Sequence, residues 1–132
     1  MNKHSEILGI LTILQTTSYS DVQSINQLLE YGFQLQQHIA FSGEAMAEAK
    51  ELLHTARKAA YLKVDASMNA QGKKWTPMLV KDYVNDCCSK ENAYYELCER
   101  CNRSATHSLD FVRTAISALK AEMQSIQFQT SI

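Results

Sequence analysis

Proline and glycine are scarce in this sequence, which holds one proline and four glycines in 132 residues. β-Sandwiches and β-barrels use both residues in their many tight turns, so the composition argues against an all-β fold. Hydrophobic residues make up 45% of the chain and charged residues 20%, a balance that suits a folded domain rather than a disordered segment. We therefore expect residues 1–132 to form a single helical domain.

Long apolar runs and a large net charge are also missing. The densest apolar block, residues 7–14, is far shorter than the roughly 20 residues that a membrane span needs. It lacks the flanks of a secretory signal, since Glu6 precedes it and Gln15 follows it. The formal charge of −1 provides no general attraction to phosphate backbones. We expect a cytoplasmic protein with no membrane contact and no nucleic-acid partner.

The four cysteines do not have the spacing of a metal site. A structural zinc ion needs four ligands that converge on it, usually through a reversal of the chain. Cys88 and Cys98 fall on one predicted helix, about 15 Å apart along its axis, so they cannot share an ion. Cys98 and Cys101 lie on the apolar face of that helix, where cysteine packs as a small hydrophobic residue. We expect reduced thiols and no metal site.

Motifs for cofactors and catalysis are missing as well. The sequence has no GxxxxGK[ST] or GxGxxG motif, and no strand pattern that would support either. Ser104, His107 and Asp110 would point the same way from one rigid helix, and the pattern provides no opposing surface to enclose a substrate. We expect neither a cofactor nor an enzymatic activity.

What the chain does have is helical periodicity, in two long stretches of matched length. The second stretch, about 77–127, starts at Thr76 and Pro77, a capping residue followed by a proline at the first helical position. Apolar residues then recur at steps that mostly alternate between three and four, with no further glycine or proline. This pattern predicts one continuous helix with a heptad-like seam.

The first long stretch, about 21–71, starts at the capping pair Ser20-Asp21 and ends before Gly72. The connector, residues 72–76, is short enough to force the two stretches to pack antiparallel. Within the first stretch, Ser42-Gly43 predicts a bend or a close helix crossing.

A shorter apolar pattern, with Ile7, Leu8, Leu11 and Leu14 at helical spacing, predicts a helix over about 4–15. This helix either folds back on the long helices or docks on another subunit. The complete expectation is an all-α fold, a long antiparallel helical hairpin with a short N-terminal helix. Two long helices have too little cross-section to bury both seams and the aromatic residues, so we expect homo-oligomerisation to complete the bundle.

A polar stripe follows the face opposite the seam of the second stretch. Its members recur at steps of four and three, and they are Arg103, His107, Asp110, Thr114 and Ser117. Arg113 lies between the two faces. The stripe is either solvated, with pairs formed along one helix, or a specific contact face. Its mixture of residue types favours a contact buried between helices or between subunits.

Trp75 is the only tryptophan, and it falls in the connector directly after Lys73 and Lys74. It either caps the core of the hairpin or forms, with the two lysines, a contact site at the tip.

Residues 102–122 resemble the C-terminal helix of small all-helical proteins encoded by phages and prophages. The shared pattern is N-R-x-x-x-H-x-x-D-x-x-R-T-x-I-S-x-x-K, and residues 47–62 are similar to the partner helix of such proteins. The resemblance implies a non-enzymatic accessory protein of a phage or mobile element that acts by binding in the host cytoplasm. Some small helical phage proteins inhibit host immunity, so interference with a host defence protein is the role that this resemblance implies.

Two alternatives stay open. One is an oligomeric binder of a small anionic ligand, such as a nucleotide signal, held between chains by cations and stacked on a tyrosine. The residues available for it are Arg103, His107, Arg113, Lys120, Tyr94 and Tyr95. The other is a purely structural oligomer.

Overall fold

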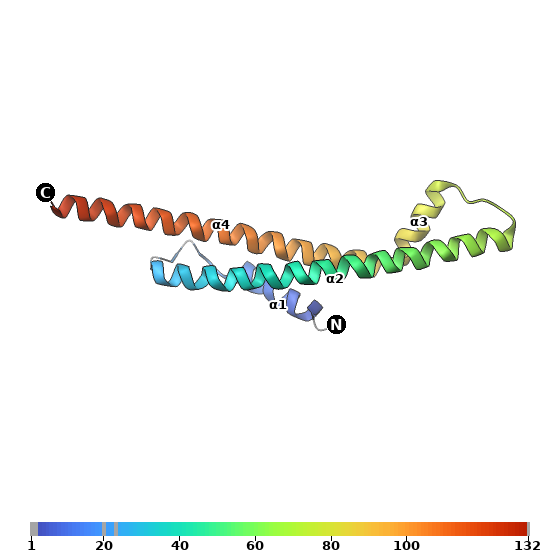
Figure 1. The fold of residues 1–132 in the computed structure, drawn as a ribbon, viewed down its shortest axis with the longest axis horizontal. Helices are drawn as coiled ribbons and strands as arrows, with labels where there is room; N and C mark the ends of the chain where they lie inside the picture. The colour runs from blue at the N-terminus through green and yellow to red at the C-terminus, as the bar shows by residue number, and fades with distance from the viewer. Residues whose placement is uncertain (1–2, 20, 23, 132) are drawn as a thin grey trace.

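The computed structural model describes residues 3–19, 21–22 and 24–131, and within these residues it is helical without any strand (Figure 1). The predicted all-α class is therefore confirmed for the described part of the chain. Four helices follow one another: α1 is Lys3–Thr16, α2 is Ile25–Gln71, α3 is Pro77–Cys87 and α4 is Ser89–Ser131.

The two long helices, α2 and α4, lie side by side and run in opposite directions (Figure 1). They are shifted along their common axis. The C-terminal part of α4 extends past the start of α2, and the last turns of α2 extend past the start of α4. Helix α3 packs on those last turns of α2, whereas no helix in the described part of the chain covers the end of α4 in the same way.

The ends of α2 follow from local capping. Ser24 is the N-cap residue, and its hydroxyl accepts a hydrogen bond from the Gln27 N–H at 3.4 Å. The helix ends at Gly72, whose φ of 63° is left-handed and suits glycine alone among common residues.

The start of α2 differs from the one expected at Ser20-Asp21. Ser20 lies outside the described residues, and Asp21 belongs to a turn in which its carboxylate accepts from the Ser18 hydroxyl at 3.1 Å. Tyr19 and Val22, on either side of the turn, pack against the core between α2 and α4. Helix α2 therefore begins only after its N-cap residue Ser24.

The predicted continuous helix over 77–127 is wrong, because the stretch forms two helices that separate at Cys88. Helix α3 does begin at Pro77, with the Thr76 hydroxyl accepting from the Leu79 N–H at 3.2 Å. At Cys88 the backbone leaves helical geometry, with φ −106° and ψ 14°. The Cys88 side chain is fully buried in the cluster that joins α2 to α3. Burial of this cluster turns α3 onto α2, and no proline or glycine marks the break.

Small side chains allow α2 and α4 to approach closely at their centre. The residues that are completely buried there are Ser42, Ala45, Ala49, Cys98, Cys101 and Ala105. A Cβ atom added at Gly43 would lie 3.7 Å from Asn102 Nδ2 of the facing helix, which is ordinary contact distance. The close crossing expected at Ser42-Gly43 is present, and α2 continues through it as one helix.

Helix α1 folds back across this crossing and packs on both long helices. Its buried residues Ile7, Ile10 and Leu11 share a cluster with the small residues of α2 and α4. Full burial of such aliphatic side chains contributes about 1.5–3 kcal/mol each. The N-terminal helix is thus the third helix of its own chain, the first of the two arrangements that the sequence leaves open.

Candidate binding surfaces

The polar stripe of α4 faces solvent in this chain. Arg103 pairs with Glu99 at 2.6 Å one turn away, and Arg113 lies 3.7 Å from Asp110. The side chains of Arg103, Asp110 and Arg113 are 61%, 64% and 65% exposed. The Thr114 hydroxyl donates to the Asp110 carbonyl at 3.0 Å. The prediction of a contact buried between helices is therefore wrong within the chain, because these side chains pair along α4 itself.

A partly buried polar contact between the two helices lies one position away from the stripe, at Asn102. Its Nδ2 donates to the Ile39 carbonyl and to the Ser42 hydroxyl, each at 3.1 Å. The Ser42 hydroxyl in turn donates to the Ile39 carbonyl at 3.2 Å. Asn102 falls within the apolar seam, one residue after Cys101. A polar amide at a seam position opposite Ser42-Gly43 is the sequence signal that could have identified it.

Two members of the stripe line a shallow hollow on the α2 and α4 surface. Arg103 and His107 lie there beside Tyr95, in an open volume of about 390 Å³. Asp110 and Thr114 of the stripe do not line it, and neither does Arg113, which lies beside the stripe. Glu99 borders the same hollow and already neutralises Arg103, which opposes the binding of an anion there.

At the tip of the hairpin, Trp75 caps the core. Its indole packs edge-on against Tyr83, with ring centroids 5.5 Å apart, and its Nε1 donates to Gln71 Oε1 at 3.3 Å. The ring is partly buried against the cluster of α2 and α3. Lys73 and Lys74 are exposed directly before it in the chain. The tip therefore presents two cations next to an indole ring whose position is held by Tyr83 and Gln71.

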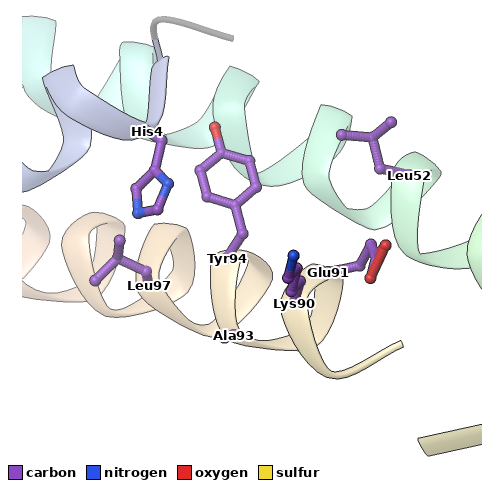
Figure 2. Close-up of a pocket in the computed structure, with 7 residues that line it drawn as sticks. All are labelled: His4, Leu52, Lys90, Glu91, Ala93, Tyr94 and Leu97. Atoms are coloured by element: carbon purple, nitrogen blue, oxygen red, sulfur yellow. The ribbon is translucent and has the colours of Figure 1, made fainter. Parts of the chain in front are cut away.

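A larger open groove, of about 590 Å³, lies where the start of α1 meets α2 and the first turns of α4 (Figure 2). His4 comes from α1, Leu52 from α2, and the remaining lining residues from α4; these are Lys90, Glu91, Ala93, Tyr94 and Leu97. No sequence motif indicates this groove, because it exists only where three separate helices meet. We call it the α1 groove.

Tyr94 and His4 form one wall of the α1 groove. Their rings lie 5.2 Å apart at an interplanar angle of 47° (Figure 2). Burial, with a smaller contribution from a hydrogen bond with Cys98, raises the pKa of Tyr94 to about 12. The phenol is therefore neutral at physiological pH, and the wall offers an uncharged aromatic face.

Among the charged residues around the α1 groove, Lys3 is paired, whereas Lys90 and Glu91, which line the groove, form no ion pair among the described residues. Lys3 forms ion pairs with Glu48 at 2.5 Å and with Glu44 at 3.3 Å, which tie the start of α1 to α2. The hydrogen bond that Lys3 Nζ donates to Glu48 is the main reason that the pKa of Lys3 is raised. Glu91 is different, because its Oε2 atom is buried and has no hydrogen-bond partner among the described residues.

The position of Glu91 in α4 explains this unpaired oxygen. Glu91 is the third residue of the helix, from which a glutamate commonly reaches back to accept from the N–H of the capping residue. That residue is Cys88, whose N–H instead donates to the Val84 carbonyl of α3 at 3.1 Å. Because α3 runs directly into α4, the usual partner of the Glu91 carboxylate is already occupied.

The C-terminal part of α4 exposes an apolar strip. Met123 is 51% exposed and Ile126 54%, whereas Phe128, which is 68% exposed, lies on the opposite side of the helix. Leu119, Met123 and Ile126 border an open hollow of about 510 Å³ whose other side is the first turn of α2, at Ser24 and Ile25. The exposed strip of α4 therefore begins next to the first turn of α2, where the packing between the two helices ends.

The cysteines are free thiols, and three of them are buried: Cys88, Cys98 and Cys101. Burial raises the pKa of Cys101 to about 11, so this side chain is a neutral thiol and a poor nucleophile at pH 7. Among the described residues, no group of three or more histidine, cysteine or acidic side chains is placed to hold a metal ion. A search of the same residues found no helix long and apolar enough to cross a membrane.

The chain matches no protein-family model, and comparisons with curated proteins and with solved structures give no match. What the protein does must therefore be inferred from its own surfaces.

Proposed function

We propose that this protein is a non-enzymatic binding protein that self-associates through the C-terminal part of α4 and acts on a partner protein. The observation that carries self-association is the seam of α4. Its residues Ile116, Leu119, Met123 and Ile126 keep the alternating spacing of a heptad. Among the described residues, Ile116 and Leu119 pack against the core of α2 and α4, whereas Met123 and Ile126 are about half exposed. The heptad spacing of α4 continues beyond the point where α2 packs against it. The exposed part of this seam therefore suits packing against a helix from a second copy of the chain.

The size of the exposed strip sets the strength of this association. Covering Met123 and Ile126, each half exposed or more, provides about 1–2 kcal/mol per side chain. Four such side chains in a twofold pair provide about 4–8 kcal/mol, against an association cost of about 4–15 kcal/mol. Because the free energy gained by burial is similar to the cost of association, we expect a weak oligomer that dissociates as the protein concentration falls.

Light scattering across a range of protein concentration tests this proposal. Wild-type protein is expected to gain mass as its concentration rises, and the double variant Met123→Glu/Ile126→Glu is expected to stay monomeric. Gln124→Glu/Ser125→Glu adds the same charge on the other side of α4 and serves as the matched control. A wild-type protein that remains monomeric at all micromolar concentrations would overturn self-association.

The proposed partner is a host protein, and the proposed setting is a phage or mobile element that interferes with host defence. The resemblance of residues 102–122 to phage-encoded helices supports this setting. The exposed stripe around Arg103 and His107 supplies a contact face of mixed polarity. Capture from host lysate with wild-type protein and with Arg103→Ala/His107→Ala tests the face. A host protein held equally by both would remove the stripe from the proposal.

A small anionic ligand is the second candidate, favoured by the position of Tyr95 beside Arg103 and His107 in one hollow. Such a ligand would have to displace Glu99 from Arg103. A thermal-shift screen of nucleotides and cyclic dinucleotides separates the two candidates, since stabilisation by one of them would favour the ligand. If neither a ligand nor a host protein binds, the protein is a purely structural oligomer.

A further inference from the structure

We propose that two copies of the chain associate in antiparallel orientation through the C-terminal parts of their α4 helices, with Met123 of each copy packed on Ile126 of the other. In this arrangement the end of the second α4 continues the line of α2, and its last turn fills the hollow beside Ser24 and Ile25. The inference rests on the proposed self-association, and it assigns the orientation and the register of the pair.

The direction of the second helix follows from the shape of the chain. The exposed strip lies on the side of α4 that faces α2, just beyond the start of α2 (Figure 1). A helix laid parallel on the strip would continue, through its N-terminal part, into the space that α2 occupies. An antiparallel helix continues away from α2 and past Ser131, where no other described helix lies (Figure 1). Only the antiparallel orientation therefore fits the strip without a bend in α4.

The register follows from the length of α4 beyond α2. From Leu119, which lies beside the first turn of α2, to Ser131 the helix is about 18 Å long. The second copy has an end of the same length, and packing Met123 on Ile126 lets the two ends overlap completely. A shift of one heptad towards α2 would drive the second helix into Ser24. A shift of one heptad away would leave Met123 with no described residue opposite it, so one register covers the strip.

The charges beside the strip agree with this register. Lys120 and Glu122 flank the apolar seam on its two sides, at positions that contact the neighbouring helix in a coiled coil. In the antiparallel pair Lys120 faces Gln127 of the second copy, and Glu122 faces Gln129 of the second copy. No like charges therefore meet across the pair.

The antiparallel pair also decides how the other surfaces are presented. The two polar stripes lie on separate halves of the pair, with the Arg103 residues about 65 Å apart along its axis. The hairpin tips at Trp75 point to opposite ends. The associated protein therefore offers each contact surface twice, with room for one partner molecule on each half.

The first test changes the charge at Gln129. Gln129→Lys places two new cations opposite the two Glu122 side chains and is expected to tighten association about three- to fivefold, the sum of two exposed ion pairs. Gln129→Glu is expected to weaken association by a similar factor. In a parallel pair Gln129 faces no charged residue, and both variants would behave as wild type. Sedimentation equilibrium measures the association constants.

The same two charges at Ser125 are the matched control, because this residue lies on the side of α4 away from the strip. Ser125→Lys and Ser125→Glu alter the helix end in the same way and should leave the association constant unchanged. Circular dichroism of all four variants establishes that their helices are intact.

The second test measures the orientation directly, by pulsed electron paramagnetic resonance of a spin label on one cysteine per chain. Cys87→Ala provides the background, since the other three cysteines are buried. Labels at Gln124→Cys and Asp110→Cys lie on the same side of α4, two heptads apart. The antiparallel pair predicts about 20 Å between the labels at 124 and about 45 Å between those at 110. A parallel pair predicts the same short distance for both.

Three results would overturn the proposal: equal short distances at the two labels, no tightening by Gln129→Lys, or wild-type protein that stays monomeric in these experiments. Only the last of these would also remove the proposed self-association. A pair that forms with parallel distances would keep the self-association and remove the orientation, so the two failures are told apart.

Discussion

Asn102 of α4 donates hydrogen bonds both to the Ser42 hydroxyl and to the Ile39 carbonyl of α2, 60 and 63 residues away in the chain. The contact joins the two long helices at their closest approach, beside Gly43. An amide at this point favours one register of α2 against α4, because shifting either helix would break both hydrogen bonds, one of which reaches the fully buried Ser42.

Asn102→Ala is expected to lower the free energy of unfolding by about 1–2 kcal/mol, since it removes two partly buried hydrogen bonds and leaves a small gap. Urea denaturation monitored by circular dichroism provides the value. Arg103→Ala, the next residue on the exposed side, loses only a surface ion pair and should cost about 0.5 kcal/mol or less. Equal losses for the two variants would contradict the assignment of Asn102 as the buried contact.

The polar stripe beyond Arg103 should be nearly neutral for stability. Asp110→Ala removes a 3.7 Å pair between two exposed side chains, so a change of about 0.5 kcal/mol or less is expected in dilute monomeric protein. The denaturant midpoint is measured at low and at high protein concentration. A loss that appears only at high concentration would place Asp110 in a contact between subunits.

Two glycines should respond to alanine with opposite signs. Gly32→Ala adds a Cβ that lies 3.9 Å from Leu109 and Val112, without a clash, and should stabilise α2 by about 0.5–1 kcal/mol. Gly72→Ala forces a side chain into the left-handed conformation and should destabilise the protein by about 1 kcal/mol. Thermal unfolding measures the change in both variants. A stabilised Gly72→Ala would show that Gly72 does not end α2 as described, and a destabilised Gly32→Ala would contradict the prediction for Gly32.

Glu91→Leu is expected to raise the free energy of unfolding by about 1 kcal/mol. The variant removes a buried unpaired carboxylate oxygen, whose burial costs about 1–3 kcal/mol. It also loses a favourable charge at the start of α4, which is worth about 0.3–1 kcal/mol. Glu96→Leu on the exposed side of α4 is the control. A destabilised Glu91→Leu would show that the carboxylate is satisfied in the unbound protein.

Stability should fall in alkaline solution as the pH rises from about 9 to about 11. Burial raises the pKa of Cys101 from 9.0 to about 11, so over this range the unfolded chain has lost a proton that the folded protein keeps. Below pH 9 both states hold the proton and the contribution is constant. Above it the loss approaches about 1.4 kcal/mol per pH unit for this one group.

Urea denaturation from pH 8 to pH 11 measures this slope, and Cys101→Ala should flatten it relative to wild type. Cys87→Ala, which changes an exposed thiol, serves as the control. An identical slope in Cys101→Ala and wild-type protein would contradict the prediction.

Local signals in the sequence determined where the helices of this protein can start and stop. Gly72 ends α2, and Thr76 with Pro77 starts α3, because capping depends on a few neighbouring residues whose preferences act within one turn. The scarcity of glycine and proline together with the heptad spacing likewise determined the all-α class, since periodicity of 3.6 residues is a property of the chain alone.

Tertiary structure decided the features that depend on which surfaces meet. The break at Cys88 carries no local signal, and it exists because burial of Val84 and Cys88 against α2 outweighs the helical preference of the chain around them. The α1 groove and the unpaired oxygen of Glu91 follow from that break and from the docking of α1. The solvent exposure of the stripe and of the end of α4 was decided by the shift between α2 and α4, which side-chain packing over the whole interface sets and no single stretch encodes.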